Sequence, residues 1–140
     1  MKIGIIKEGK IPQDKRVPLT PLECKELLEK FPQVELFVQP SEIRTFKDTE
    51  YTDLGIILKE DLSDCEVLIG VKEVPYDMLI PNKTYFFFSH TTKEQPYNQK
   101  LLRTVLDKSI RLVDWENLTN QKGSRVIAFG RYAGIVGAYN

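Results

Sequence analysis

Short apolar runs that alternate with amphipathic segments constrain the fold of this chain most strongly. Each run is rich in β-branched or aromatic residues and is too short for a buried helix, which is typical of a strand. The segment Val34–Val38 alternates, but the other runs are nearly continuous in apolar residues, which indicates strands buried on both faces. The predicted strands are Ile3–Ile6, Val34–Val38, Ile56–Leu58, Val67–Val71, Tyr85–Phe88 and Ile110–Val113.

The clearest predicted helix begins in the segment TPLECKELLEKF. Thr20 is a suitable N-cap, Pro21 occupies the first helical position, and Glu23 stands at the third position, where it can complete a capping box. The remaining apolar residues predict one stripe that covers the sheet, formed by Leu22, Leu27, Leu28 and Phe31.

A second helix is predicted from Gln95 to Lys108, with a stripe of Leu101, Leu102, Val105 and Leu106. Predicted strands and helices therefore alternate along the chain. This order favours an α/β fold with an open, mainly parallel sheet flanked by helices.

Length and charge limit the kinds of partner that we expect. The 140 residues suit a single domain, and 20 basic residues balance 20 acidic residues, so no broad field attracts nucleic acid or an anionic membrane. Cys24 and Cys65 are isolated, which fits neither a disulfide framework nor a metal cluster. No apolar run is long enough to span a bilayer. We expect no nucleic-acid or membrane partner, and a reducing, cytoplasmic setting.

Ionisable residues follow the predicted strands where a parallel sheet places its ligand sites. Lys72 follows one apolar run, His90 follows the aromatic run, and Arg16 lies in the long loop after the first run. If the strands are parallel, these side chains approach one cleft as an amine, an imidazole and a carboxylate clamp. Taken singly, each also has a structural explanation, as a solvated lysine, a boundary histidine or a surface arginine.

Glycine spacing argues against a nucleotide site in this chain. The nearest candidate for GxGxxG is GRYAGIVG at residues 130–137, and its spacing does not match. The sequence also contains no P-loop, no GxSxG motif and no residue set spaced for a metal. The predicted fold is thus Rossmann- or flavodoxin-like without the dinucleotide fingerprint, and we expect neither a metal nor a cofactor bound to this chain alone.

Four ordered blocks carry a family resemblance. They read DKRVPLTP at 14–21, LIGVKEVP at 68–75, FFSHTTKEQPYN at 87–98 and GSRVIAFGRYAG at 123–134. Together they resemble the N-terminal domain shared by alanine dehydrogenase, the transhydrogenase alpha subunit and lysine-forming saccharopine dehydrogenase. The last two blocks are most similar to the saccharopine dehydrogenase and lysine-ketoglutarate reductase branch.

This resemblance implies an amino-acid dehydrogenase with its active site between two α/β domains. It implies that Lys72 and His90 are the acid/base groups and that Arg16 holds a substrate carboxylate. In the saccharopine branch, the positions near the substrate match Lys93, Gln95, Arg125 and Phe129, and the acidic residues that tune the pair match Glu73 and Glu116. The expected ligands are an amino acid and a 2-oxo acid, with lysine and 2-oxoglutarate preferred to ammonia and pyruvate.

The resemblance also implies a division of the chain. Residues 1–129 match the substrate-binding, catalytic domain, and 130–140 match the start of a helix that links it to a nucleotide-binding domain, which would hold NAD or NADP in the full-length enzyme. We expect this chain alone to be inactive. Ile135, Val136 and Tyr139 add apolar surface at this end that would support self-association.

Other functions stay open at this level. The chain could be the N-terminal domain of an alanine dehydrogenase, a stand-alone, non-catalytic module that binds an amino or oxo acid, or an interaction domain whose Gly/Ala-rich end docks onto a partner helix. A reading frame that continues past Asn140 into a strand and a glycine-rich turn would favour the enzyme.

Overall fold

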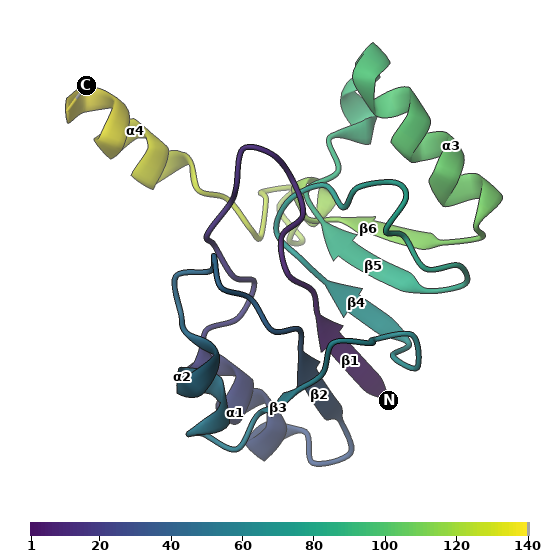
Figure 1. The fold of residues 1–140 in the computed structure, drawn as a ribbon. Helices are drawn as coiled ribbons and strands as arrows, with labels where there is room; N and C mark the ends of the chain where they lie inside the picture. The colour runs from purple at the N-terminus through teal and green to yellow at the C-terminus, as the bar shows by residue number, and fades with distance from the viewer. Residues whose placement is uncertain (140) are drawn as a thin grey trace.

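A computed structural model describes residues 1–139 and contains one six-stranded sheet, in the order β3-β2-β1-β4-β5-β6. Each neighbouring pair of strands is parallel, as predicted (Figure 1). The strands lie within one or two residues of the apolar runs. They are β1 (Lys2–Ile5), β2 (Glu35–Val38), β3 (Ile57–Leu58), β4 (Val67–Ile69), β5 (Thr84–Phe87) and β6 (Arg111–Asp114).

The strand order reverses between β1 and β4. The chain runs outward from β1 through β2 to β3, and then returns to place β4 on the other side of β1. Gly4 pairs with Leu68 in this central register. In open parallel sheets such a reversal leaves a crevice beyond the carboxyl ends of the two strands. The loops that follow Ile5 and Ile69 meet there.

Two apolar clusters lie on opposite faces of the sheet. One packs against α3 (Gln99–Asp107) and is centred on Leu68, Tyr85 and Phe87. The other packs against α1 (Pro21–Lys30) and α2 (Asp48–Thr52) and is centred on Ile5 and Val38. Figure 1 shows the corresponding separation of the helices, with α1 and α2 beside β2 and β3, and α3 beside β5 and β6.

Helix α1 (Pro21–Lys30) begins with the predicted capping box, in which Thr20 and Glu23 exchange hydrogen bonds. Its predicted stripe was wrong at both ends, because Leu22 and Phe31 are exposed. Leu22 lies on the opposite side of the helix from Cys24, which is fully buried, and Phe31 has left the helical conformation at the C-cap.

Helix α3 (Gln99–Asp107) starts later than predicted, because the preceding turn, Pro96–Asn98, is a 3₁₀ helix. Leu101 and Val105 are buried against the sheet, whereas Leu102 and Leu106 are exposed, so the predicted stripe was too wide. Residues adjacent in sequence point about 100° apart on a helix, so a narrow contact buries only one residue of each Leu-Leu or Val-Leu pair.

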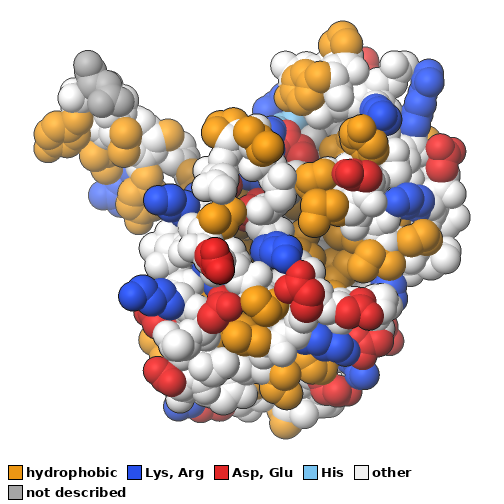
Figure 2. Space-filling model, viewed as in Figure 1, with side chains coloured by type: hydrophobic (Ala, Val, Ile, Leu, Met, Phe, Trp, Pro, Cys, Tyr) orange, Lys and Arg blue, Asp and Glu red, His pale blue; other side chains and the backbone are white. Residues whose placement is uncertain are grey.

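Two further α-helices are α2 (Asp48–Thr52), which the sequence analysis did not predict, and α4 (Gly130–Tyr139). Helix α4 extends away from the sheet, and hydrophobic side chains gather along it in Figure 2. Its exposed large side chains are Tyr132, Ile135, Val136 and Tyr139. Among the helices of residues 1–139, none has both the length and the apolar character needed to cross a membrane.

Candidate functional site

The backbone of the β5–α3 connection sets the direction of His90. The chain leaves β5 and reaches His90 in a left-handed conformation with a φ of 55°, just before the 3₁₀ turn η1 (Thr91–Lys93). The imidazole stacks on Phe88, with 6.4 Å between the ring centroids. Asn98 donates a side-chain hydrogen bond to the His90 carbonyl at 3.1 Å. The ring of His90 is thus packed against the residue that follows β5, and its main chain is bonded to the 3₁₀ turn before α3.

A buried Ser–Asp pair fixes the residue before His90. The hydroxyl of Ser89 donates to Oδ2 of Asp114 at 2.5 Å, and the main-chain N–H of Ser89 donates to the same oxygen at 3.2 Å. Both side chains are buried, and they join the ends of the paired strands β5 and β6. These contacts anchor the turn on which His90 stands. Neither residue was given a role in the site from the sequence.

Glu116 collects the positive charge around His90. It lies in the 3₁₀ turn η3 (Trp115–Asn117). Its carboxylate oxygens lie 3.1 Å from His90 Nδ1, 3.2 Å from Lys93 Nζ and 3.0 Å from Arg125 Nη2. The hydrogen bond from His90 is the main reason that the pKa of Glu116 lies below its ordinary value, and Lys93 and Arg125 add to this effect. The carboxylate is therefore ionised at neutral pH.

These contacts define how His90 can carry protons. Nδ1 also lies 3.2 Å from Lys93 Nζ, but it cannot donate to Glu116 and accept from Lys93 at once. Lys93 already pairs with the carboxylate of Glu116, so donation from Nδ1 to Glu116 satisfies all three groups. In that tautomer, neutral His90 has its free lone pair on Nε2.

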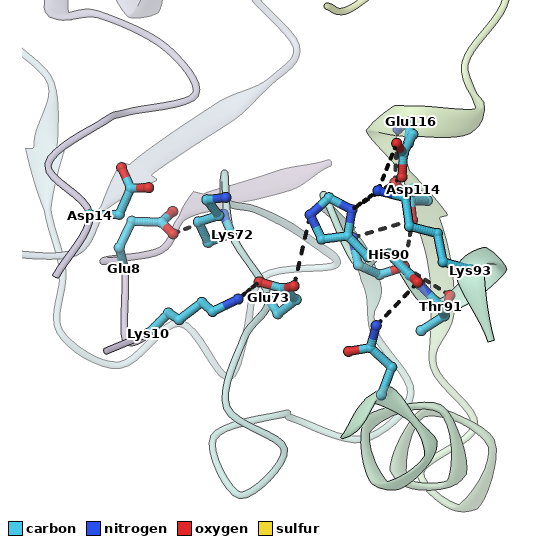
Figure 3. A network of polar contacts seen from close by, with 12 residues as sticks. Glu8, Lys10, Asp14, Lys72, Glu73, His90, Thr91, Lys93, Asp114 and Glu116 are labelled. Atoms are coloured by element: carbon cyan, nitrogen blue, oxygen red, sulfur yellow. Dashed lines mark hydrogen bonds and ion pairs between the residues drawn. The ribbon is translucent and has the colours of Figure 1, made fainter. Parts of the chain in front are cut away.

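The other ring nitrogen faces a second carboxylate. Nε2 of His90 lies 3.9 Å from Oε1 of Glu73, and this oxygen is buried without a hydrogen-bond partner among the described residues. The second oxygen of Glu73 pairs with Lys10 at 2.6 Å. Figure 3 shows His90 between Glu116 on one side and Glu73 on the other. A proton that reaches Nε2 would face Glu73, which makes His90 suited to proton exchange.

Lys72 stands beside Glu73 in the loop after β4. Its main-chain N–H donates to Glu8 at 2.9 Å, and Lys72 lies between Glu8 and His90 in Figure 3. The hydrogen bond from Arg16 is the main cause of the lowered pKa of Asp14, and the positive charge of Lys72 adds to this effect. The amine and the imidazole therefore come from neighbouring strand ends, β4 and β5, as predicted from the sequence.

Arg16 lies in the loop after β1, where it pairs with Asp14. Its Nε and Nη2 donate to the Asp14 carboxylate at 2.9 and 2.5 Å, and this pair lowers the pKa of Asp14 and raises that of Arg16. The guanidinium also lies over the ring of Phe129, at 5.6 Å. Phe129 in turn contacts Phe88, with 5.9 Å between centroids. A chain of rings thus connects Arg16 to His90.

Two hollows lie beside the residues described above. An apolar cavity of about 280 Å³ is lined by Phe88, Phe129 and Trp115, and an open one of about 500 Å³ is lined by Lys10 and Glu73. Arg16, Lys72 and His90 line neither. Within residues 1–139, no group of three or more His, Cys, Asp or Glu side chains is placed to hold a metal ion.

The structure brings together His90, Lys93, Glu116 and Arg125, with Glu73 at the edge of the group. Arg16, Lys72 and Phe129 lie outside this ion-pair group, because Arg16 pairs with Asp14 and lies over Phe129, and Lys72 contacts Glu8 through its main chain. Gln95 lines a different hollow beside Thr91 and Leu102 and makes no side-chain hydrogen bond within residues 1–139.

Glu8, Lys10 and Asp14 were missed by the sequence analysis. All three lie in the long charged loop after β1, next to the predicted Arg16. The charge of that loop was the one signal that could have indicated them.

Comparison with known proteins assigns the family. The profile of the "Alanine dehydrogenase/PNT, N-terminal domain" family matches residues 4–136. The chain is 42% identical over 127 residues to the mitochondrial alpha-aminoadipic semialdehyde synthase of Bos taurus, which covers 91% of this chain and 14% of that protein. It is 33% identical over 132 residues to the saccharopine dehydrogenase [NAD(+), L-lysine-forming] of Yarrowia lipolytica, of which it spans 35%.

Solved structures confirm the fold. An L-alanine dehydrogenase has a TM-score of 0.69 at 21% identity, covering 89% of this chain and 35% of that chain. A transhydrogenase from Sinorhizobium meliloti has a TM-score of 0.67 at 13% identity, covering 84% of this chain and 36% of that chain. The match to the family profile extends over nearly all of the sequence, and the parallel sheet is shared with the solved relatives. This chain belongs to the alanine dehydrogenase/PNT N-terminal domain family.

Proposed function

We propose that this chain is the substrate-binding half of an NAD(P)-dependent amino-acid dehydrogenase of the saccharopine (lysine-forming) or lysine-ketoglutarate reductase type. The observation that carries the proposal is His90, oriented by Glu116 at 3.1 Å on one ring nitrogen and facing Glu73 at 3.9 Å on the other. The names of the relatives, which include a lysine-forming saccharopine dehydrogenase, support this substrate class.

The residues of this chain do not fit a dinucleotide. The glycines near 130–137 lack the fingerprint spacing and lie in α4, which follows no strand directly. A nucleotide-binding domain elsewhere in the protein would hold NAD or NADP, which supplies the hydride acceptor when bound. The part of this chain is to bind the amino and oxo acids and to move protons.

The proton steps follow from the arrangement of Lys72 and His90. Oxidation of a secondary amine such as saccharopine requires the nitrogen to lose its proton, and Lys72 would accept it. Once a hydride has also left the adjacent carbon for the nicotinamide, the resulting imine adds water, and the carbinolamine separates into lysine and 2-oxoglutarate. His90 would take the proton from the attacking water at Nε2 and return a proton to the departing amine. The charge of Glu116 stabilises the imidazolium between these two transfers.

Arg16 would orient the oxo acid. A guanidinium donates two parallel hydrogen bonds to a carboxylate, the geometry that Asp14 now occupies. A substrate carboxylate would compete with Asp14 for this fork. Phe129 beneath the guanidinium limits the directions from which the carboxylate can approach.

The test is nicotinamide oxidation by the complete protein that carries this chain. We expect turnover with lysine and 2-oxoglutarate and a much lower rate with ammonia and pyruvate, while the reverse preference would favour an alanine dehydrogenase. Lys72→Met should lower kcat by about 100-fold or more, because general acid/base groups contribute at least this factor. Lys25→Met, at an exposed lysine of α1, is the matched control. A near-normal rate for Lys72→Met would refute the acid/base assignment.

A further inference from the structure

Glu8 connects the loops that leave the two central strands. Its Oε1 accepts the main-chain N–H of Val71 at 2.7 Å, and its Oε2 accepts that of Lys72 at 2.9 Å. Within residues 1–139, no ion pair joins this carboxylate to a lysine or arginine side chain. Both oxygens therefore serve the backbone of the loop that carries Lys72, although 64 residues separate Glu8 from Lys72.

This contact completes the hydrogen bonding of a short stretch of main chain. Gly70 donates to a carbonyl of β5 at 2.8 Å and accepts from the indole N–H of Trp115 at 2.9 Å. The carbonyl of Val71 accepts from Phe88 N–H at 2.9 Å. With the carboxylate added, each polar main-chain group from Gly70 N to Lys72 N has a partner. The Cα of Lys72 is thus fixed relative to the strand ends.

The packing of the two loops depends on a glycine. A Cβ at Gly70 would lie only 2.9 Å from the Cδ1 of Ile6, whereas its distance of 3.4 Å from the Oε1 of Glu8 would be an ordinary contact. The absence of this atom lets the β1 loop pack directly on the β4 loop. The carboxylate is placed there at an electrostatic disadvantage, because burial raises the pKa of Glu8 in spite of the two amides that stabilise its charge.

The position of the contact gives it a functional meaning. It lies at the reversal of strand order, beyond the carboxyl ends of β1 and β4, where an open parallel sheet binds its ligand. Asp14 is the main cause of the raised pKa of Arg16, and Glu8 lies close enough to that side chain to add to the effect. The carboxylate thus stands between the predicted carboxylate clamp and the predicted acid/base lysine.

We propose that Glu8 is a positioning residue that holds the Gly70–Lys72 main chain and thereby places the Lys72 amine for proton transfer. The inference rests on the proposed function of Lys72. Glu8 acts through the backbone, because it contacts the main chain of Lys72 and need not contact the substrate.

Glutamine and aspartate test different parts of this contact. Glu8→Gln keeps the length of the side chain but has only one acceptor oxygen, so its amide group would face an N–H donor and one of the two bonds would be lost. Glu8→Asp keeps the charge and both oxygens but is shorter by one methylene. Glu60→Gln is the matched control, because Glu60 pairs with Lys7 of the same loop at the exposed surface.

The decisive experiment is a double-mutant cycle in the complete protein. We expect Glu8→Gln to lower kcat by about 10-fold or more, with KM for the oxo acid changed by less than about 3-fold, because small displacements of a catalytic group reduce the rate steeply. In the Lys72→Met background, the same change should reduce the residual rate by less than about 2-fold, because a residue that acts through Lys72 has nothing left to position. An unchanged kcat, or an equal loss in both backgrounds, would overturn the proposal.

Amide hydrogen exchange gives a readout that does not depend on activity. Glu8→Gln should increase the exchange rate of the Val71 or Lys72 amide by about 10-fold or more, while that of Gly70, which bonds to β5, stays protected. If Glu8→Gln does not fold, Glu8→Asp provides the same comparison. Unchanged exchange at both amides would show that Glu8 does not hold the Gly70–Lys72 main chain. A normal rate for Lys72→Met would refute only the role of Lys72.

Discussion

Nδ1 of His90 lies 3.1 Å from Oε2 of Glu116, which is 26 positions further along the chain, in the turn after β6. The contact joins an imidazole to a carboxylate that is 9% exposed, and two cations, Lys93 and Arg125, contact the same carboxylate. Glu116 is therefore both the electrostatic centre of the candidate site and a contributor to folding stability.

Replacing this carboxylate should change the pH dependence of stability. The folded-state pKa of Glu116 lies below its ordinary value of 4.5, so its stabilising effect is present above that value and is lost as the pH falls through the folded-state pKa. Glu116→Gln should therefore lower Tm at pH 7, and the difference from wild type should shrink below about pH 4. Thermal unfolding at several pH values measures this. Glu29→Gln, at an exposed carboxylate of α1, is the control, and a Tm difference that is independent of pH would contradict the assignment.

Arg16 should control substrate affinity more than turnover. Lysine keeps the charge but cannot donate the parallel hydrogen bonds of a guanidinium. Arg16→Lys in the complete protein should raise KM for the oxo acid by about 10-fold or more, with a smaller effect on kcat, because a charge-assisted hydrogen bond contributes about 1.5–3 kcal/mol. Steady-state kinetics with Arg111→Lys, at an exposed residue of β6, provides the comparison. Equal KM values for the two variants would argue against the clamp.

Ser89 should be needed to anchor the His90 turn. Its hydroxyl is fully buried, and its loss in Ser89→Ala leaves the buried Asp114 with one hydrogen bond fewer. We expect the free energy of unfolding to fall by about 1–3 kcal/mol. Urea denaturation measures it, and Ser63→Ala, which removes an exposed Ser–Asp hydrogen bond, should change it by less than about 0.5 kcal/mol. Similar losses of unfolding free energy in the two variants would show that burial does not account for the effect of Ser89→Ala.

The fold of the sheet was largely predictable from the sequence, because strand formation here depends on local apolar runs. The run at Tyr85–Phe88 marked β5 within one residue, and the N-cap at Thr20 marked the start of α1. Predictions failed where tertiary contact decides. Leu22 is apolar, but it lies on the side of α1 that faces away from the sheet. Helix α2 is only five residues long and has too little periodicity to be detected.

The candidate site was predictable where a residue follows a strand. His90 and Lys72 stand just beyond β5 and β4, so the parallel topology alone brings them to the same edge. Glu8 could not be found in this way, because its partners are main-chain amides 63 and 64 residues away and any sequence supplies such amides. Gln95 was placed near the substrate by resemblance alone, and that role stays a prediction.

Substitution of Gly4 should destabilise the fold through steric overlap in the core, more than the change in strand propensity would. A methyl group there would lie 2.8 Å from Leu62 Cδ1, 2.9 Å from Leu68 Cδ2 and 3.3 Å from the sulfur of Cys65. Gly4→Ala should therefore lower the free energy of unfolding by about 1–3 kcal/mol, as overpacking of a core does. Chemical denaturation is the measurement. Gly134→Ala, in the exposed helix α4 where the added atom meets open space, should be neutral or stabilising, and a gain at Gly4 would contradict the packing argument.

The turn that carries the imidazole includes two left-handed residues, His90 with a φ of 55° and Glu94 with a φ of 50°. Such a conformation costs about 1 kcal/mol for a residue with a side chain, and glycine adopts it without this penalty. The two positions differ in what they tolerate. Glu94 is exposed, so Glu94→Gly should raise Tm, whereas Thr92→Gly, nearby but not left-handed, should lower it. The turn can thus be stabilised at Glu94 without changing His90, whose direction the left-handed backbone determines.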